Sequence, residues 1–244
     1  MKANFSRKVK HNMKTAIMQP YFLPYIGYFQ LIAAVDKFII YDRIKYTKKG
    51  WINRNRMLLN GSDTMFSLPL KKGSDALEVV EREIADDFAP EKLLAQFAGA
   101  YRRAPHFEPT FELLRSVLMH GERNLFGFIQ HSLRTVCGYL SIGTPIQVSS
   151  SLPFDNALKA HDKVLAVCEA AGARTYVNPI GGTELYSEKT FAERGIELRF
   201  LRSRPLEYPQ FGAPFVPWLS IVDVMMFNPV GVVIETIQNQ FDLL

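Results

Sequence analysis

The pattern of apolar and polar residues at the start of the chain predicts a strand, a helix and a second strand. Residues 15–18 form a short apolar run, and two prolines at positions 20 and 24 prevent a strand or helix from continuing through the next segment. An apolar helical spacing covers residues 25–36, and residues 37–41 are again apolar, β-branched and aromatic. A strand that returns beside the first through a helix predicts a βαβ unit in a parallel sheet.

The same order of elements recurs later in the chain. Residues 174–177 read as a strand, a glycine-containing turn follows, residues 186–193 read as a helix, and residues 196–201 read as another strand. Three helical patterns occupy the middle of the chain, at about residues 85–140. We therefore predict an α/β fold with a βαβ-based parallel sheet core, in which residues 13–244 form a single domain with a helical insertion.

Two further helices are predicted on either side of the second unit. Residues 156–171 have an apolar helical stripe, and residues 218–227 form an almost wholly apolar helix that contains one acid, Asp223. A carboxylate in so apolar a segment is paired, capped or functional. A structural hydrogen bond is favoured here over a catalytic role.

Composition and charge limit the classes of function. The 244 residues carry a net charge of +5, and residues 1–12 hold much of it without an acid. We expect this segment to be a disordered basic tail, or sequence upstream of a second start at Met13. The rest of the chain is close to charge balance, which argues against nucleic-acid binding. No apolar run approaches the ~20 residues that span a bilayer, and no secretory signal is evident, so a cytoplasmic protein is expected.

The cysteines and histidines do not indicate a metal site. The two cysteines, Cys137 and Cys168, lie in apolar helical patterns and form no CxxC motif, so buried free thiols are expected. His106, His120 and His131 are not at metal-ligand spacing. No protein-ligated metal is predicted, although a divalent metal bound through a substrate's phosphates remains open.

A basic segment follows the second predicted strand. Cations alternate there with aromatic and amide side chains, a mixture that suits a phosphate, while a solvated basic loop is the alternative. Asp42 ends the preceding strand and is the acid–base candidate, because ligands of parallel sheets sit at the carboxyl ends of strands. The residues expected to bind substrate or phosphate in this segment are Lys48, Trp51, Asn53, Arg54 and Arg56.

Other candidates follow the first strand and the strand at residues 174–177. Gln19, Tyr21 and Tyr28 are expected to line the floor of the site, with Tyr28 as a second catalytic candidate. Asn178, Gly181 and Gly182 are expected at the rim, because two adjacent glycines let backbone N–H groups approach an anion. A tight turn without a ligand is the alternative reading of the two glycines.

Several blocks of the chain, in order, resemble the WbqC-like protein family from Met13 to the C-terminus. The resemblance implies an association with bacterial surface-polysaccharide (O-antigen) gene clusters and a cytoplasmic protein. The blocks that carry it are MQPYFLPYIGYFQLIAAVDKFIIYD, KKGWINRNRMLLNG, NPIGGTELY, GIELRFL and FVPWLSIVDVMMFN.

The opening unit is also similar in pattern to nucleotidyltransferase-type α/β domains. Those domains have a His-x-Gly-His pair at the start of the helix, where this chain has Tyr25-Ile26-Gly27-Tyr28. Tyrosine is neutral at pH 7 and cannot replace an imidazolium, so lysine and arginine would have to neutralise the phosphates.

These observations predict a transferase that takes a nucleotide-activated sugar or an acyl donor as its small-molecule substrate. The alternative is a non-catalytic nucleotide-sugar binding protein or scaffold of a glycan-synthesis complex. The cofactor is not identified by the residues, and a nucleotide and a divalent metal both remain open.

Overall fold

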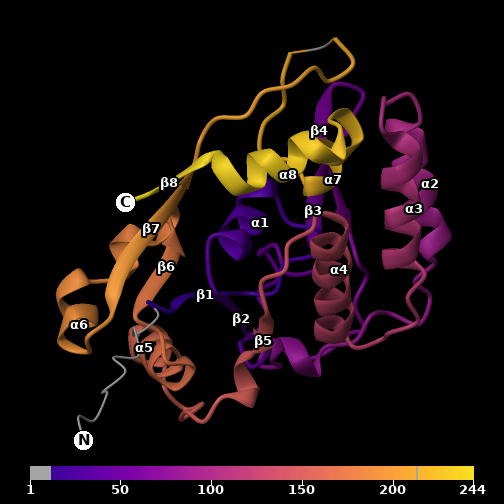
Figure 1. The fold of residues 1–244 in the computed structure, drawn as a ribbon. Coiled ribbons are helices and arrows are strands. Elements are labelled where there is room, and N and C mark those ends of the chain that lie inside the picture. The colour runs from indigo at the N-terminus through magenta and orange to yellow at the C-terminus, as the bar shows by residue number, and fades with distance from the viewer. Residues whose placement is uncertain (1–11, 213) are drawn as a thin grey trace, which may run out of the picture.

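A six-stranded, mostly parallel sheet organises the structure (Figure 1). The computed structural model describes residues 12–212 and 214–244, so the predicted disordered tail lies outside the described residues except for its last residue. The strand order is β5-β2-β1-β6-β7-β8, and only β8 runs antiparallel to its neighbour. The parallel α/β core predicted from the sequence is confirmed, whereas the division into one domain stays a prediction.

The elements follow one another along the chain with short connections. The strands are β1 (Lys14–Met18), β2 (Lys37–Ile40), β3 (Arg54–Leu59), β4 (Ser62–Ser67), β5 (Ile146–Val148), β6 (Thr175–Pro179), β7 (Glu197–Ser203) and β8 (Phe241–Leu243). The α-helices are α1 (Ile26–Ala33), α2 (Pro90–Tyr101), α3 (Phe107–Leu118), α4 (Leu125–Tyr139), α5 (Ala160–Ala171), α6 (Glu188–Glu193), α7 (Ile221–Phe227) and α8 (Val230–Asn239). The 3-10 helices are η1 (Val79–Glu81), η2 (Ser149–Ser151) and η3 (Ile180–Leu185). None of the helices among the described residues has both the length and the apolar character needed to cross a membrane.

The opening β1-α1-β2 unit forms as the apolar pattern predicted. Strands β1 and β2 pair in parallel, with Ala16 opposite Phe38 and Met18 opposite Ile40. The proline-containing loop between β1 and α1 turns the chain back over the sheet. Gly27 is required in the first turn of α1, because a Cβ there would collide with the Tyr25 ring and with the Ser203 hydroxyl.

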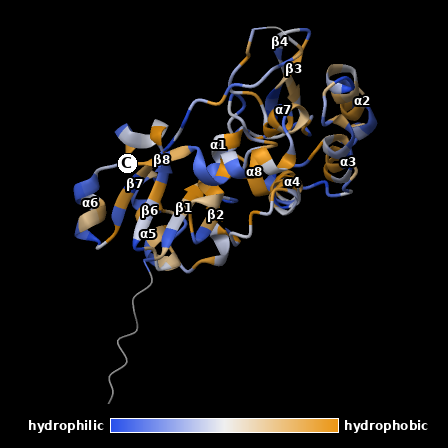
Figure 2. Ribbon diagram, turned by 45° about the horizontal axis from the view of Figure 1, so that its top comes forward, coloured by the Kyte–Doolittle hydropathy of each residue, from blue (hydrophilic) through white to orange (hydrophobic). Residues whose placement is uncertain are grey.

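Apolar clusters cover both faces of the sheet, and successive side chains of a strand point to opposite faces. Ala16 and Phe38 face the larger apolar cluster with α1, α7, α8 and the middle helices, whereas Ile17 and Ile39 face a second cluster with α5 and α6. Figure 2 shows the apolar residues concentrated where the helices meet the strands. The strands therefore read as continuous apolar runs.

The second unit, β6-η3-α6-β7, repeats the parallel arrangement on the other side of β1. Strand β6 pairs with β1 and with β7, both in parallel. From β1 the chain moves outward to β2, and from β5 it crosses back to β6. The order of strands therefore reverses between β1 and β6, and this reversal decides where a ligand can enter.

The helices α2, α3 and α4 occupy the middle of the chain, at the position predicted for the helical insertion. They lie beside the β3–β4 hairpin and away from α5 and α6 (Figure 1). Three predicted helices begin two or more residues later than expected: α5 at Ala160 instead of residue 156, α6 at Glu188 instead of residue 186, and α7 at Ile221 instead of residue 218. Strand β3 begins at Arg54, inside the basic segment.

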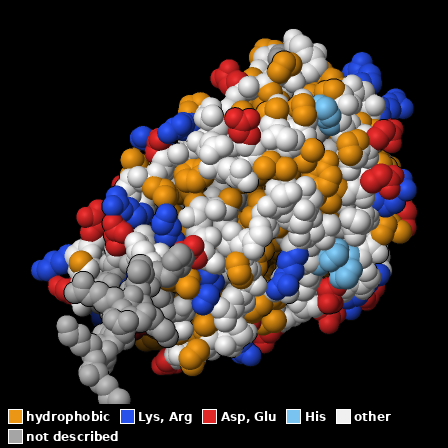
Figure 3. All heavy atoms as spheres, viewed as in Figure 1, with side chains coloured by type: hydrophobic (Ala, Val, Ile, Leu, Met, Phe, Trp, Pro, Cys, Tyr) orange, Lys and Arg blue, Asp and Glu red, His pale blue; other side chains and the backbone are white. Residues whose placement is uncertain are grey.

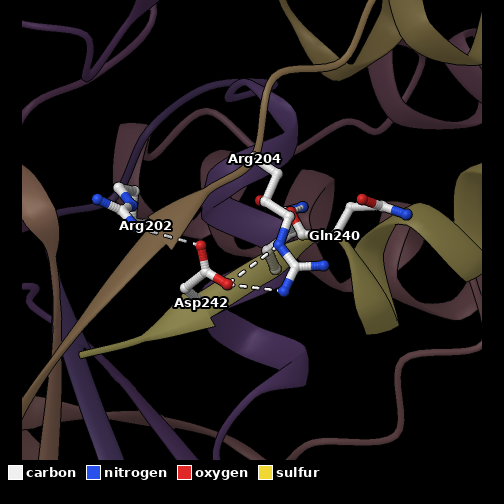
Figure 4. A network of polar contacts seen from close by, with 5 residues as sticks. Arg202, Arg204, Gln240 and Asp242 are labelled. Atoms are coloured by element: carbon white, nitrogen blue, oxygen red, sulfur yellow. Dashed lines mark hydrogen bonds and ion pairs between the residues drawn. The ribbon is translucent and has the colours of Figure 1, made fainter.

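The C-terminal strand β8 was not foreseen from the sequence, because it has only three residues. It pairs antiparallel with the end of β7, with Leu201 opposite Leu243. Asp242 lies between Arg202 and Arg204 (Figure 4). Its carboxylate accepts hydrogen bonds from both guanidinium groups, the shortest being 2.7 Å from Arg204 Nη2. These ion pairs and the strand pairing fasten the C-terminus to the edge of the sheet.

The buried carboxylate of Asp223 joins three parts of the structure. It accepts hydrogen bonds from the Tyr101 hydroxyl of α2 at 2.9 Å, from the Tyr208 hydroxyl at 2.6 Å and from the Gln210 amide at 2.7 Å. Tyr101 in turn accepts a hydrogen bond from the backbone N–H of Leu58 in β3, at 2.7 Å. These contacts are structural hydrogen bonds of the kind that the sequence favoured for Asp223.

Replacing this carboxylate by an amide of the same shape tests its contribution. Asp223→Asn leaves one acceptor oxygen where three donors converge, so at least one buried donor meets an NH₂ group. We expect the free energy of unfolding, measured by urea denaturation at pH 7, to fall by about 2–4 kcal/mol. Tyr208→Phe removes one donor and is the milder control, with an expected loss of about 1 kcal/mol. A loss below that of the control would show that the network does not depend on the carboxylate.

Candidate functional site

A cavity of about 580 Å³ lies where the strand order reverses, at the carboxyl ends of β1 and β6. Its volume is typical of sites for small molecules and cofactors. The end of β1 contributes Met18 and Gln19, and the end of β6 contributes Asn178 and Pro179. A crevice at such a reversal is the place where ligands of open parallel sheets bind.

The first turn of α5 forms one wall of the cavity. This helix carries the chain from β5, at one side of the sheet, to β6 on the other side of β1, so it begins at the carboxyl edge of the strands. Its residues His161 and Lys163 line the cavity. Among the described residues, His161 Nε2 is buried and has no hydrogen-bond partner. The ring lies 5.3 Å from the Phe191 ring and 5.9 Å from the Tyr186 ring, measured between centroids.

The turn after β6 forms the opposite wall and contains the two adjacent glycines. Asn178 Nδ2 donates to the Tyr176 hydroxyl at 2.5 Å, which fixes the orientation of the amide. A Cβ on Gly182 would collide with the Asn178 Oδ1 atom, whereas a Cβ on Gly181 would meet nothing within 4 Å. Gly182 is therefore required for the close approach of the turn to Asn178, and Gly181 is not.

The cavity is lined by one lysine, Lys163, and no aspartate or glutamate is among the described residues that line it. The Lys163 ammonium donates to the backbone carbonyl of Arg43 at 2.9 Å and lies 5.7 Å from the centre of the Tyr41 ring. The start of a helix adds partial positive charge and unpaired backbone N–H groups. This combination suits a ligand with negative charge.

Five of the residues predicted to bind substrate come together in this cavity. They come from the ends of two neighbouring strands and the loops that follow them, so the parallel sheet brings them together from distant parts of the sequence. They are Gln19, Tyr21, Asn178, Gly181 and Gly182.

Asp42, the predicted acid–base residue, does not line the cavity. Its side chain is 3% exposed. Oδ1 accepts hydrogen bonds from the Ser149 hydroxyl at 2.7 Å and from the Ser150 backbone N–H at 3.1 Å. Burial alone would raise the pKa of this carboxyl, but the hydrogen bonds from Ser150 and Ser149 outweigh it, so the pKa lies below its ordinary value.

Tyr28 is also enclosed within the fold. Its hydroxyl donates to the backbone carbonyl of Gln19 at 2.8 Å, and its ring packs against Phe38 with 5.4 Å between centroids. Burial raises the pKa of Tyr28 well above its ordinary value, and the hydroxyl stays protonated at physiological pH. The contact holds the chain at the end of β1, where Gln19 enters the cavity.

The basic segment does not converge on the large cavity. Lys48 forms an exposed ion pair with Asp75, at 2.7 Å. Arg54 Nε donates to the Gly50 carbonyl at 3.0 Å. Asn53 is used inside the fold, because its amide donates to the Leu68 carbonyl and accepts from the Tyr46 hydroxyl.

Trp51 and Arg56 lie at a smaller neighbouring cavity of about 190 Å³. Tyr21 lines both the smaller and the larger cavity. Arg56 forms an ion pair with Asp63 of the hairpin turn, at 2.9 Å. The predicted residues of the basic segment therefore divide between surface ion pairs, internal hydrogen bonds and this second cavity.

His161 and Lys163 are the residues of the large cavity that the sequence did not point to. A histidine and a lysine in the first turn of a predicted helix are ordinary surface residues unless the strand order is known. The available signal was the strand before this helix, because a crossover helix in a parallel sheet begins at the carboxyl edge of the strands. That signal places the first turn at the correct edge without saying which strands lie below it.

No group of three or more His, Cys, Asp or Glu residues that could hold a metal ion occurs in the described parts of the chain. On the face shown in Figure 3, lysine and arginine side chains lie among acidic ones around the edge, with apolar side chains across the middle. The charges on this face are mixed and do not form one basic surface.

Comparisons with known proteins give a family match and a related protein, each over most of the chain. Residues 19–233 match the WbqC-like protein family. The chain is also 30% identical over 219 residues to a Mycobacterium tuberculosis protein named uncharacterized protein Rv1507c, and the match covers 88% of this chain and 93% of that protein. No solved structure matches the chain.

The two glycines of the cavity wall give a matched pair of variants. Gly182→Ala forces the Asn178 side chain away from its position, which separates it from Tyr176. We expect the free energy of unfolding to fall by about 1–3 kcal/mol. Gly181→Ala, with open space around the added Cβ, should change it by less than about 0.5 kcal/mol. Equal losses for the two variants would contradict the packing described for Gly182.

The lowered pKa of Asp42 predicts a pH-dependent contribution to stability. A carboxyl with a lower pKa in the folded state stabilises the fold above its unfolded pKa of about 3.9, and this contribution is lost as the pH falls through the folded pKa. At pH 7 we expect Asp42→Ala to lower the free energy of unfolding by about 1–3 kcal/mol. The deficit relative to the unmodified protein should shrink below about pH 4.

Urea denaturation between pH 7 and pH 3 measures this deficit. Burial raises the pKa of Asp223, so its contribution to stability changes with pH in the opposite sense. Asp223 is present in both the variant and the unmodified protein, so the difference between their free energies of unfolding isolates Asp42. The exposed Asp87→Ala is the control, with no expected deficit at any pH. A deficit for Asp42→Ala that stays constant as the pH falls would contradict the lowered pKa.

Proposed function

Because the chain belongs to the WbqC-like protein family, we propose that it is a transferase of bacterial surface-polysaccharide (O-antigen) synthesis. Its substrate in this proposal is a nucleotide-activated sugar or an acyl donor carried on a nucleotide. The observation that carries the proposal is the cavity at the strand reversal, which is lined by a lysine and a histidine and by no described acid.

Both donor classes contain phosphate groups, and the cavity suits them. In the proposal the first turn of α5 and the turn at Gly181 and Gly182 offer backbone N–H groups to the phosphates. Lys163 supplies the positive charge, and the amides of Gln19 and Asn178 offer both donors and acceptors to the rest of the donor. A divalent metal on the phosphates is compatible with this arrangement and is not required by it.

The acid–base role in the proposal falls to His161. Its ring lines the cavity, and its Nε2 atom lacks a hydrogen-bond partner among the described residues. It would take the proton from a hydroxyl or amine of the acceptor as that group attacks the transferred sugar or acyl carbon of the donor. The bond from that carbon to the donor's carrier breaks, and the nucleoside phosphate or the carrier thiolate leaves. The catalytic roles first expected for Asp42 and Tyr28 remain predictions, but their internal hydrogen bonds favour positioning roles for both.

The analogy with nucleotidyltransferase-type domains receives limited support. In those domains the glycine at the start of the first helix gives phosphates access to the backbone. In this chain the space beside Gly27 is filled by Tyr25 and Ser203. The proposal therefore assigns the phosphates to the first turn of α5 and not to that of α1.

A non-catalytic nucleotide-sugar binding protein or scaffold remains the second candidate. It is favoured by the internal hydrogen bonds of Asp42 and Tyr28, since neither predicted catalytic side chain lines the cavity. Retention of an unchanged donor after incubation with the protein and a mixed saccharide acceptor pool would favour this reading.

Thermal unfolding with a panel of donors tests the proposal. The probes are UDP-glucose, dTDP-glucose, GDP-mannose and acetyl-coenzyme A, with CMP as a nucleotide that carries no group to transfer, each with and without Mg²⁺. A donor at ~100 times its dissociation constant should stabilise the fold by about 2.7 kcal/mol. We expect Lys163→Ala to weaken this stabilisation, because it removes the charge that faces the phosphates.

The controls separate the cavity from the basic segment. Lys48→Ala removes a lysine that is paired with Asp75 outside the cavity, and it should leave the stabilisation unchanged. A stabilisation that is lost in Arg54→Ala and retained in Lys163→Ala would move the donor site to the basic segment. If no probe stabilises the protein, the proposal of a phosphorylated donor fails.

A further inference from the structure

Both tryptophans of the chain lie at the smaller cavity, and both are exposed. The chain contains two tryptophans, and the cavity of about 190 Å³ is lined by Trp51 and Trp218. Trp51 is 39% exposed and Trp218 is 65% exposed. Tryptophan is highly buried on average, so two exposed indoles around one cavity mark a surface that binds another molecule.

Trp218 is held in place by the hairpin and by the loop before α1. Its backbone carbonyl accepts a hydrogen bond from Arg56 Nη2 at 3.1 Å, and the Tyr25 ring meets its indole edge-on, with 6.0 Å between centroids. Its φ is 61°, a left-handed conformation that non-glycine residues adopt rarely. The residue is thus fixed while its side chain stays exposed, and backbone strain of this kind is concentrated at functional sites.

The polar groups of the cavity favour a neutral ligand with oxygen acceptors. The Arg56 guanidinium is already paired with Asp63, so its charge is compensated. Its Nε–H is buried and has no acceptor in the part of the chain that the structure describes. An oxygen of a ligand in the cavity would supply the missing acceptor.

The size and the surroundings of the cavity limit the shape of the ligand. A volume of 190 Å³ lies below the roughly 300–1,000 Å³ of sites for drug-sized molecules, so the cavity holds a single ring. Tyr21 is shared with the large cavity, and Tyr25 and Trp218 are shared with a third cavity of about 490 Å³. The ring would therefore be one unit of a longer molecule.

We propose that the cavity between Trp51 and Trp218 binds one pyranose ring of a neutral saccharide, the acceptor of the proposed transfer. The role of the saccharide as acceptor rests on the proposed function, whereas its binding to the cavity does not. The C–H bonds on one face of a pyranose pack against the electron-rich face of an indole. A ring or hydroxyl oxygen accepts from Arg56 Nε–H, and the neighbouring large cavity holds the donor.

Intrinsic fluorescence tests the proposal directly, because both fluorescent indoles line the cavity. The probes are the methyl pyranosides of glucose, galactose, mannose and rhamnose, followed by maltose and lactose. We expect a saturable change in tryptophan emission with at least one of them, and a lower dissociation constant for a disaccharide than for its monosaccharide. In Trp218→Ala, where Trp51 still reports, the dissociation constant should rise about tenfold or more.

A conservative variant and competing probes keep the test specific. Trp218→Phe retains an aromatic face and should recover most of the lost affinity, and circular dichroism of each variant checks that the fold is retained. The proposal is overturned if no saccharide gives a saturable change up to about 100 mM. It is also overturned if uridine or adenosine binds in place of the saccharides, or if Trp218→Ala binds as tightly as the unmodified protein.

The two proposals fail independently of one another. A donor that stabilises the protein through Lys163, without any saccharide response, would overturn the saccharide site alone. A saccharide response without stabilisation by any donor would overturn the proposed transfer and leave the saccharide site in place.

Discussion

The buried carboxylate of Asp223 is the contact on which the arrangement around the sheet depends. It is inaccessible to solvent, and it collects hydrogen bonds from α2 and from the loop before α7, while Tyr101 extends the network to β3. A buried charge is tolerated only where donors surround it, so these segments have to meet at this point. The position of the β3–β4 hairpin relative to α7 follows, and with it the contact between Arg56 and the Trp218 carbonyl.

The second constraint is the order of the strands. Strand β1 is central, so the chain has to cross the sheet once, from β5 to β6. That crossing brings the first turn of α5 to the carboxyl edge beside Gln19 and Asn178. The cavity is therefore a consequence of topology. Its positive charge comes from the start of α5 and from Lys163, not from the segment of the sequence with the most cations.

Much of the sheet could be predicted from the sequence, because the spacing of apolar residues and the positions of prolines and glycines are local features. Apolar runs between prolines and glycines marked β1, α1, β2, β6 and β7, and the ends of those strands gave Gln19 and Asn178. The boundaries failed where a local pattern is ambiguous. The alternating Arg54-Asn55-Arg56 reads as a basic loop, although it pairs with β4, because the partner strand was needed to see it. To place His161 and Lys163 at the cavity, the order of the strands had to be known, and strand order is not a local property of the sequence.

The contacts of the basic segment show why the number of cations in a stretch of sequence is a weak guide to an anion-binding site. A cation contributes to binding only if it faces a cavity without a compensating acid, since exposed pairs contribute little and are screened by salt. Lys48 is paired with Asp75 and Arg56 with Asp63, and each acid lies later in the sequence than the run of cations that it neutralises. Lys163, by contrast, has no carboxylate within ion-pair distance among the described residues. A single cation in such a setting attracts an anion more strongly than several that are already paired.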